Sequence, residues 1–329
     1  MTVMVTGASG FVGKTLIDSL AHTGVTGSGV SRTKIPRLPA GWNWRERHGV
    51  LRGVEAAPEP PPDWVIHLEV KHHVTDPMPT DEEEFERVNR GGTKEWLDWC
   101  SLRGVTKFAY FSSIKAIGGS SQVLDEGTNL PPGTPYGKSK LGGEMHVRAW
   151  AGEDRRRTAL ILRPAVIYGP GSKSNIGSMI RAIDQGYFFL VGRNDNVKSM
   201  VSITNVVAAS RHLLSRASPG TAVYNLVDRQ SYTVHQIAHM IVQRLGKRHA
   251  RTVPEPLARV MAVAGDIVNR FTGIHPPFTT LRLKALTETT HFSCRKLVET
   301  NFMHPQTTEE GIGEMVEWYL RSGTSAAPG

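Results

Sequence analysis

Residues 2–15 read TVMVTGASGFVGKT, and this stretch sets the fold of the chain around it. A short apolar run ends at the first glycine, and apolar residues then recur at helical spacing, which predicts a strand, a tight turn and a helix. Glycine suits such a turn because a Cβ would keep a phosphate away from the backbone, while the helix N-terminus favours an anion. The residues expected to contact a dinucleotide here are Gly7, Gly10, Phe11, Val12 and Gly13.

Strands and helices alternate beyond this turn. Apolar runs predict strands that end near Ser31 and that cover residues 63–68, 105–111, 158–162 and 222–226. Helices are predicted at 80–102, opened by a Thr80–Glu83 capping box, and at 135–150 and 204–215. The alternation predicts an α/β fold with a doubly wound parallel sheet of the Rossmann type. Prolines between residues 53 and 63 exclude a crossover helix there.

The chain is expected to divide into a larger and a smaller part. Residues 1–168 are predicted to form a dinucleotide-binding Rossmann domain, to which residues 199–227 return. A smaller C-terminal substrate lobe would comprise residues 169–198 and 228–323, with helices near 234–245, 256–271 and 308–320. Residues 324–329 would form a flexible tail.

The composition favours a globular protein and argues against several other classes. The chain has 329 residues, 39% of them hydrophobic, which suffices for a sizeable core. Two cysteines, Cys100 and Cys294, cannot build a disulfide framework. The sequence opens without a secretory leader and contains no apolar run long enough to span a membrane, so we expect a cytoplasmic protein. The net charge of +9 suits an anionic ligand or a merely solubilising surface, but the basic residues form no recognisable nucleic-acid module.

A serine, a tyrosine and a lysine suggest acid–base chemistry. Tyr136 and Lys140 are spaced to share one helix face, so an ammonium group can lie near the phenol. A free tyrosine has a pKa of about 10, and a nearby cation would lower that pKa toward a usable range. Ser112 and Ser113 follow a predicted strand, at the sheet edge where doubly wound folds bind ligands, and a serine hydroxyl there can stabilise a developing alkoxide.

The second strand indicates which dinucleotide binds. No carboxylate occurs between Asp18 and Glu46, whereas Arg32 directly follows Ser31. A carboxylate in this region binds the 2′-hydroxyl of NAD, and an arginine accommodates the 2′-phosphate of NADP. NADP(H) is therefore the favoured NAD(P) cofactor, with a solvated basic loop as the alternative reading.

Two other stretches of the sequence resemble ligand-binding patterns. Residues 8–15 match a P-loop except for its first glycine, and in that case Lys14 would bind phosphates and Thr15 magnesium. His67, His72 and His73 lie close together but lack a known metal-ligand spacing, so we expect no metal site.

Several motifs together resemble the extended short-chain dehydrogenase/reductase family, specifically its nucleotide-sugar epimerases and reductases. They are TGASGFVG, VIHL, NRGGT (residues 89–93), FSSIK, YGKSK and RPAVIYGPG (residues 163–171). The resemblance implies that Ser113, Tyr136 and Lys140 form a catalytic triad. It also implies cofactor contacts from Ser31, Arg32, Leu68, Asn89, Ser112, Tyr136, Lys140 and Pro164, with Pro164 beside the nicotinamide. Substrate contacts would come from Ser113, Lys115, Tyr136, Asn175, Arg193 and Lys198, with Asn175 and Lys198 beside a diphosphate.

The chain departs from the family pattern at three places. Ile114 and Lys115 stand where sugar 4,6-dehydratases carry an Asp-Glu pair, which disfavours water elimination. Glu69 and Val70 replace two small alanines, which puts cofactor contact there in doubt. No acidic residue that could meet the adenine is evident around residues 52–54.

The sequence therefore predicts an enzyme that transfers a hydride at C4 of a nucleoside-diphosphate sugar, as a 4-epimerase or a 4-ketoreductase, of the kind used in surface-polysaccharide synthesis. The alternative is a reductase of an apolar alcohol or ketone, of the hydroxysteroid or dihydroflavonol type. A non-enzymatic dinucleotide-binding relative is disfavoured because all three triad residues are present. The resemblance further implies a homodimer formed through the helices 80–102 and 135–150.

Overall fold

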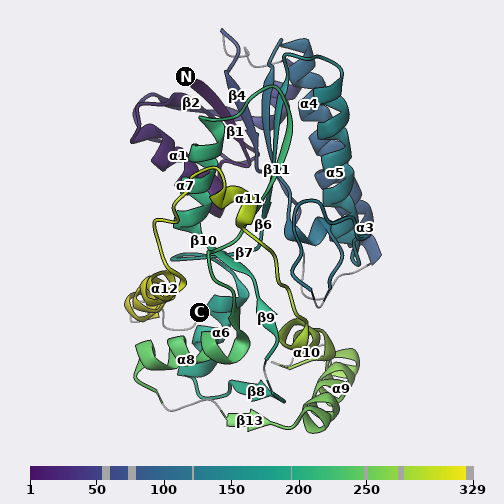
Figure 1. Cartoon of the computed structure of the whole chain (residues 1–329), viewed down its shortest axis with the longest axis vertical. Helices are drawn as coiled ribbons and strands as arrows, with labels where there is room; N and C mark the ends of the chain where they lie inside the picture. Colours follow the sequence, from purple (N-terminus) through teal and green to yellow (C-terminus); the bar gives the residue numbers. More distant parts are fainter. Residues whose placement is uncertain are drawn as a thin grey trace.

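Seven parallel strands form one sheet in the computed structural model of the chain (Figure 1). The structure describes residues 1–53, 60–72, 79–120, 122–193, 195–247, 251–272 and 278–323. The strand order is β11-β6-β5-β4-β1-β2-β3. The strands are β1 (Thr2–Thr6), β2 (Thr26–Ser31), β3 (Trp42–Glu46), β4 (Trp64–His67), β5 (Lys107–Phe111), β6 (Thr158–Pro164) and β11 (Gly220–Leu226). This is the doubly wound Rossmann topology that the alternating pattern predicted, and the prediction is confirmed.

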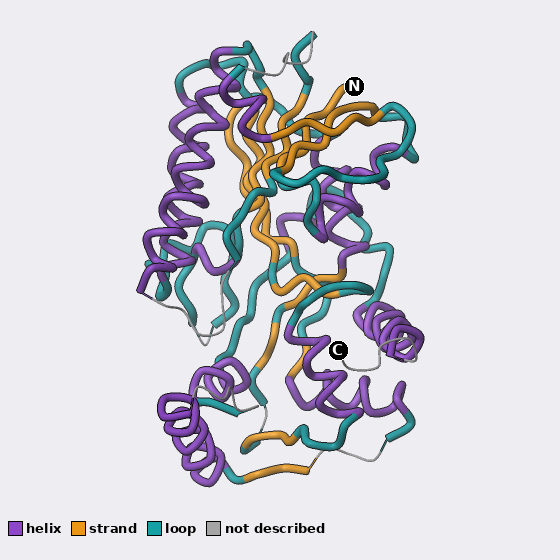
Figure 2. Tube along the Cα trace, turned by 180° about the vertical axis from the view of Figure 1, so that it is seen from behind, coloured by secondary structure: helices purple, strands orange, loops and turns teal. Residues whose placement is uncertain are grey.

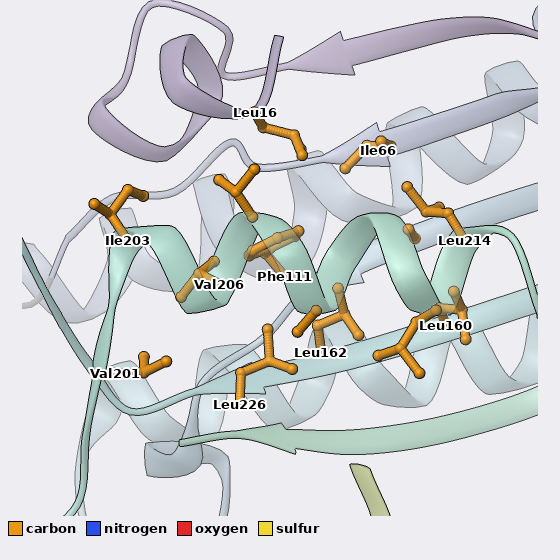
Figure 3. Packing of buried hydrophobic residues seen from close by; sticks show 14 of the residues in the cluster. Leu16, Ile66, Phe111, Leu160, Leu162, Val201, Ile203, Val206, Leu214 and Leu226 are labelled. Carbon is orange, nitrogen blue, oxygen red and sulfur yellow. The ribbon is translucent and has the colours of Figure 1, made fainter. Parts of the chain in front are cut away.

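Helices cover both faces of the sheet. On one face lie α1 (Phe11–Ala21) and α7 (Ile203–Leu214), and on the other α4 (Gly92–Leu102) and α5 (Pro135–Gly152). Figure 3 shows Leu16 of α1 and Val206 of α7 meeting side chains from the strands, among them Leu162 of β6. A separate buried cluster joins α4 and α5 to the opposite face. Burial of β-branched and aromatic residues on both faces holds the sheet edge, and with it the site, in a fixed register.

The third strand is one feature that the sequence reading missed. β3 has the sequence WNWRE, pairs with β2 in parallel and is followed by the short helix α2 (Arg47–Arg52). It lies at the edge of the sheet, so only part of it is buried and its apolar signal is weak. Its last residue, Glu46, is acidic, and its carboxylate caps α2 by accepting a 2.8 Å hydrogen bond from the amide of Gly49. The prolines Pro60 and Pro62 follow α2, and residues 54–59 lie outside the described residues.

The long helix predicted at 80–102 is divided into three segments. α3 (Pro79–Phe85) and α4 flank a π-helical turn, η1 (Glu86–Gly91). The side chain of Thr80, on which the predicted capping box depends, lies outside the described residues. Such π turns recur at functional sites, because they displace one side chain from the regular helical face. Here η1 carries Asn89.

The remaining elements form the lower part of the molecule in Figures 1 and 2. Two strand pairs connect it to the sheet region and extend it: β7 (Val166–Tyr168) with β10 (Met200–Ser202), and β9 (Val197–Lys198) with β12 (Tyr232–Thr233). A third pair joins β8 (Phe189–Val191) to β13 (Arg251–Val253). The helices of this part are α6 (Asn175–Asp184), α8 (Val234–Leu245), α9 (Glu255–Thr272), α10 (Thr280–Thr287) and α12 (Thr308–Gly323). The short helix α11 (Arg295–Val298) packs against β11 in the sheet region. The division into a dinucleotide-binding domain and a substrate lobe stays a prediction.

Candidate functional site

The glycine turn lies where the strand order reverses, between β1 and β4. Gly7 has a φ of +67°, and a Cβ on it would come within 2.8 Å of the backbone of Leu68 and Glu69. A Cβ on Gly13 would come within 2.6 Å of the Gly7 carbonyl oxygen. Two elements can approach this closely only because both residues are glycine. The turn thereby brings the start of α1 against the end of β4.

The N-terminus of α1 can accept an anion. Gly10 is its capping residue and offers no side chain to the amide groups of the first turn, which include those of Phe11 and Val12. The amides lie at the carboxyl edge of a parallel sheet, at the switch point where such folds bind dinucleotides. A diphosphate fits this position, because it would satisfy these amides and the positive end of the helix dipole.

Thr15 does not present the free hydroxyl that a P-loop needs. Its Oγ1 donates a hydrogen bond to the carbonyl of Phe11 inside α1, at 3.0 Å. Lys14 beside it is exposed.

Glu69 points away from the glycine turn, although it stands where the family usually has alanine. Its carboxylate accepts hydrogen bonds from Arg47 Nε at 2.8 Å and from Trp96 Nε1 at 2.9 Å. Arg47 also bonds Glu95 of α4 at 2.9 Å. The carboxylate is therefore held by α2 and α4, and only the backbone of residue 69 borders the turn.

Asn89 links three segments from its place in the π turn. Its side-chain amide bonds both backbone groups of Lys71, at 2.8 and 3.2 Å, and the hydroxyl of Ser139 at 3.0 Å. The residue is fully buried. Asn89 therefore fixes the loop after β4 against α5, and it acts through this backbone contact.

Ser113 and Tyr136 are brought together at the end of β5. Ser113 is the second residue after the end of β5, and its hydroxyl accepts a hydrogen bond from the amide of Lys115. Tyr136 lies in the first turn of α5, which Thr134 caps through a 3.0 Å bond to the amide of Gly137. The two hydroxyls are hydrogen-bonded, and this bond lowers the pKa of Tyr136. Burial has the larger effect and raises that pKa to about 12.

Lys140 contacts other groups than the phenol. Its Nζ donates a hydrogen bond to the carbonyl of Phe111 at 2.6 Å and lies 4.4 Å from the centre of the Tyr110 ring. Burial lowers the pKa of Lys140 to about 7, although nearby Glu144 opposes the shift. In this arrangement the ammonium binds the end of β5, and the pKa of Tyr136 is set by burial and by the Ser113 hydroxyl. The expected effect of Lys140 on the phenol stays a prediction.

A layer of buried rings lies beneath Lys140. The rings of Tyr110 and His67 are stacked with centroids 5.9 Å apart, and Nδ1 of His67 is hydrogen-bonded to the hydroxyl of Thr6 at 2.7 Å. Burial, with smaller effects from Lys140 and Arg47, holds the pKa of His67 well below its usual value. A Cβ on Gly143 would lie 2.2 Å from the hydroxyl of Tyr110. This packing explains why α5 has a glycine at that position.

Glu144 is a functional candidate that the sequence reading missed. It is fully buried, accepts hydrogen bonds from Arg163 at 2.6 and 2.8 Å, and accepts a third from the hydroxyl of Ser112 at 2.6 Å. The ion pair thus fixes Ser112, next to Ser113, against α5 and β6. Its position four residues after Lys140, on the same helix face, is a signal that could have identified it.

Two of the predicted substrate residues meet near α10. Lys115 Nζ lies 3.6 Å from the carboxylate of Glu288, and Lys198 Nζ donates hydrogen bonds to the carbonyls of Ala285, at 2.7 Å, and of Glu288. Burial lowers the pKa of Lys198 to about 8. Asn175 is exposed at the start of α6, and Arg193 is exposed after β8.

The remaining predicted cofactor residues lie at the carboxyl edge of the sheet. Ser31 ends β2 and Pro164 ends β6, while Leu68 follows β4. Arg32 is exposed directly after β2. Among the described residues, no three His, Cys, Asp or Glu side chains are grouped to hold a metal ion. His73, one of the three histidines considered for a metal, lies outside the described residues.

Comparison with known proteins identifies the group to which this architecture is related. The model of the NAD dependent epimerase/dehydratase family matches residues 3–226. The chain is 27% identical, over 96% of its length and 94% of the relative's, to an N-acetyl-alpha-D-glucosaminyl-diphospho-ditrans,octacis-undecaprenol 4-epimerase of Escherichia coli O157:H7. It is 26% identical to a UDP-glucose 4-epimerase of Vibrio cholerae, over 78% of this chain and 77% of the relative.

A solved structure has the same fold. MoeE5 in complex with UDP-glucose and NAD superposes with a TM-score of 0.76 at 22% sequence identity, covering 98% of this chain and 99% of that one. Both parts of the chain, the sheet region and the lower part, are thus included in the match.

Proposed function

Because the chain belongs to the NAD dependent epimerase/dehydratase family, we propose that it transfers a hydride at C4 of a sugar that carries a diphosphate, as a 4-epimerase or a 4-ketoreductase. The family resemblance drawn from the sequence motifs is confirmed, as is the classification as an enzyme. Support for C4 comes from the two relatives named as 4-epimerases. A nucleoside diphosphate is the first candidate for the group that carries the sugar. The Escherichia coli relative, which covers nearly the whole chain, makes a polyprenol diphosphate the second.

The roles of the catalytic residues follow from their contacts. Tyr136 donates a proton to the C4 oxygen in reduction and accepts it in oxidation, while Ser113, bonded to the same phenol, orients the oxygen. A phenol with a pKa of about 12 holds its proton at neutral pH, which suits the donor role. The acceptor role needs a lower pKa, and Lys140 would supply it by turning its Nζ from the Phe111 carbonyl toward the phenol.

The cofactor would lie across the carboxyl edge of the sheet. The amides at the start of α1 would hold its diphosphate, with Leu68 and Asn89 supporting the loop opposite and Pro164 beside the ring. A bound nicotinamide supplies the hydride acceptor and donor. Arg32 favours NADP(H), since a guanidinium forms charge-assisted bonds with a 2′-phosphate.

The substrate would occupy the edge that faces the lower part of the molecule. Lys198 and Lys115 supply positive charge there for a diphosphate, together with Asn175 at the start of α6 and the exposed Arg193. Lys198 and Lys115 are bound to the end of α10 and to Glu288 after it, through carbonyls and a carboxylate, so the diphosphate would replace some of those contacts.

The observation that carries the proposal is the hydrogen bond between Ser113 and Tyr136, at the sheet edge that also bears the glycine turn. The test incubates the protein with UDP-glucose, UDP-N-acetylglucosamine, their C4 epimers and 4-keto sugars, each with NAD(H) or NADP(H). Conversion without cofactor consumption indicates epimerisation, and a matched loss of NADPH absorbance indicates reduction. Turnover of a sterol without any sugar product would instead support the hydroxysteroid type.

Tyr136→Phe is the matching variant, and it should lower kcat by about a thousandfold or more while cofactor binding persists. Tyr187→Phe is its control, because Tyr187 is exposed and lies outside the site. Full activity of Tyr136→Phe would refute the assigned role.

We also propose that the protein forms a homodimer through α4 and α5. Leu102 at the end of α4 and Met145 on α5 are both exposed apolar residues. Light scattering that gives the mass of one chain at micromolar concentration would contradict this assembly.

A further inference from the structure

Helix α9 buries its small residues and exposes its large apolar residues. The residues it buries against the neighbouring elements are small: Ala258, Ala262 and Gly265. Its large apolar residues face outward, and they are Leu257, Val260, Met261, Val263, Ile267, Val268 and Phe271. At 3.6 residues per turn these seven fall on one broad face. A soluble helix normally shows the opposite arrangement, with the large side chains inward.

The exposure is concentrated in this helix. Phe271 is 81% exposed, Val260 66% and Ile267 52%. Of the 18 large apolar residues that are exposed in the described part of the chain, seven belong to α9. Scattered apolar residues on a surface need no explanation, but a contiguous patch of this kind marks a surface that binds another apolar body.

Helix α9, which carries the patch, lies on the outer rim of the lower part and connects to the proposed substrate cations through α10. Both views of the molecule place α9 at the periphery, packed against α10 and remote from the sheet (Figures 1 and 2). The end of α10 supplies the carbonyls that bind Lys198, and the residue that follows the helix, Glu288, faces Lys115. The exposed face and the proposed substrate cations are therefore connected through one short helix.

Basic residues accompany the patch. Arg270 on α9 and Arg282 and Lys284 on α10 are exposed, and the whole chain carries a net charge of +9. Arg259 is also on α9 and pairs with Glu255 at 2.6 Å. An apolar helix face flanked by arginine and lysine complements a surface with anionic headgroups over an apolar interior.

We propose that the outward face of α9 binds the surface of an anionic lipid bilayer, with its apolar side chains in the interfacial region and the basic residues of the α9–α10 hairpin at the headgroups. The helix lies on the membrane and does not cross it, since none of the described helices is long and apolar enough to span a bilayer. The docking itself does not depend on the proposed function.

What docking implies about the substrate does rest on the proposed function. A bilayer on the outer face of α9 would lie across that helix from α10, whose end supplies a carbonyl to Lys198 and is followed by Glu288, the partner of Lys115. A sugar diphosphate anchored in that bilayer by a lipid would then reach the site without leaving the membrane. This arrangement favours the lipid-linked sugar diphosphate as the natural substrate class.

Vesicle flotation tests the docking. The full chain is mixed with vesicles of phosphatidylcholine alone or with about one third phosphatidylglycerol, and the floating fraction is measured at low and high salt. We expect flotation with the anionic vesicles, weakened by salt. The double variant Ile267→Ser/Phe271→Ser should lower that flotation at least tenfold. The matched control Met303→Ser/Leu320→Ser removes two exposed apolar residues elsewhere and should float as the unmodified chain does.

Three outcomes would overturn the docking proposal. The first is that the unmodified chain floats with neither kind of vesicle, and the second is that the α9 double variant floats as well as the control. The third is that light scattering shows a larger assembly that the α9 double variant dissociates, without vesicle binding, which would assign the face to a second copy of the chain.

Activity assays separate this proposal from the proposed function. The α9 double variant should convert a water-soluble UDP-sugar with unchanged kcat, and Tyr136→Phe should float normally. Loss of flotation with intact turnover, or the reverse, identifies which of the two ideas has failed.

Discussion

The carboxyl edge of the sheet and the α9–α10 hairpin are built in opposite ways. At the sheet edge, charged side chains such as Lys140, Glu144 and Arg163 are buried and bonded to one another or to the backbone. On the hairpin, large apolar side chains such as Phe271 are exposed. Charge inside and apolar surface outside are both costly for a folded chain, so each needs a purpose. The buried charges are explained by their bonding partners within the protein. The exposed apolar side chains have no such explanation within the chain and point to a surface outside it.

The largest expected difference between the two regions is in the cost of breaking an ion pair, and the buried pair is Arg163–Glu144. Arg163→Leu leaves the Glu144 carboxylate fully buried, with the Ser112 hydroxyl as its one remaining hydrogen-bond donor among the described residues, so we expect the free energy of unfolding to fall by about 3–5 kcal/mol. Arg259→Leu breaks the exposed pair with Glu255 on α9 and should change it by less than about 0.5 kcal/mol. Chemical denaturation measures both. If both variants lost the same free energy of unfolding, the sheet edge and the α9–α10 hairpin would not differ in how much their ion pairs contribute to stability.

The pH dependence of stability tests the burial of Lys140. Its pKa is about 7 when folded and ordinarily 10.5, so between these values the unfolded chain holds a proton that the folded chain does not. The free energy of unfolding should therefore rise with pH across this window, by up to about 1.4 kcal/mol per pH unit, and the penalty of the buried charge should be complete below about pH 7.

The variant Lys140→Met should remove this contribution to the slope. Lys138→Met, on the exposed side of the same helix, is the control and should retain it. The measurement is denaturation of each variant at several pH values between about 6.5 and about 10. A slope that survives in Lys140→Met would show that the folded chain keeps this amine charged.

A smaller effect should appear where the two regions meet. Lys198→Met removes a cation from the proposed diphosphate position, so the KM for a sugar diphosphate should rise about tenfold with kcat little changed. Steady-state kinetics of the variant checks this against Lys173→Met, which removes an exposed lysine. If kcat falls and KM does not change, Lys198 acts on the reaction step and the assignment is wrong.

The smallest effect concerns the cofactor. Arg32 is exposed, so its loss in Arg32→Ala should raise the KM for NADP(H) by about threefold and leave that for NAD(H) unchanged. Arg37→Ala, also exposed, serves as the control. A parallel change for both cofactors would refute the NADP preference.

Strong periodicity made the helices predictable. The helix expected at 234–245 is α8 within the same bounds, and those expected at 256–271 and 308–320 are α9 and α12 with small differences at their ends. β3 was missed because an edge strand alternates polar and apolar residues over only five positions. The π turn η1 was missed because the apolar periodicity of the sequence gives no sign of an inserted residue.

The site was predictable only in part, for a similar reason. The sequence motifs predicted Ser113 and Tyr136 as site residues, and their side chains are hydrogen-bonded to each other. The preference of Lys140 for the Phe111 carbonyl depends on packing that no spacing reveals. The tether of Lys198 to Ala285 joins positions far apart in the chain, and the inverted faces of α9 became visible only when burial was known.

The close fit of Gly143 over Tyr110 constrains how this protein can evolve. Any side chain at position 143 would collide with the phenol of residue 110, whose ring also supports the Lys140 amine. A larger residue at position 143 therefore becomes possible only after Tyr110 has been replaced by a smaller residue. The order of the two substitutions is fixed, and a change that begins at position 143 disrupts the packing around the Lys140 amine.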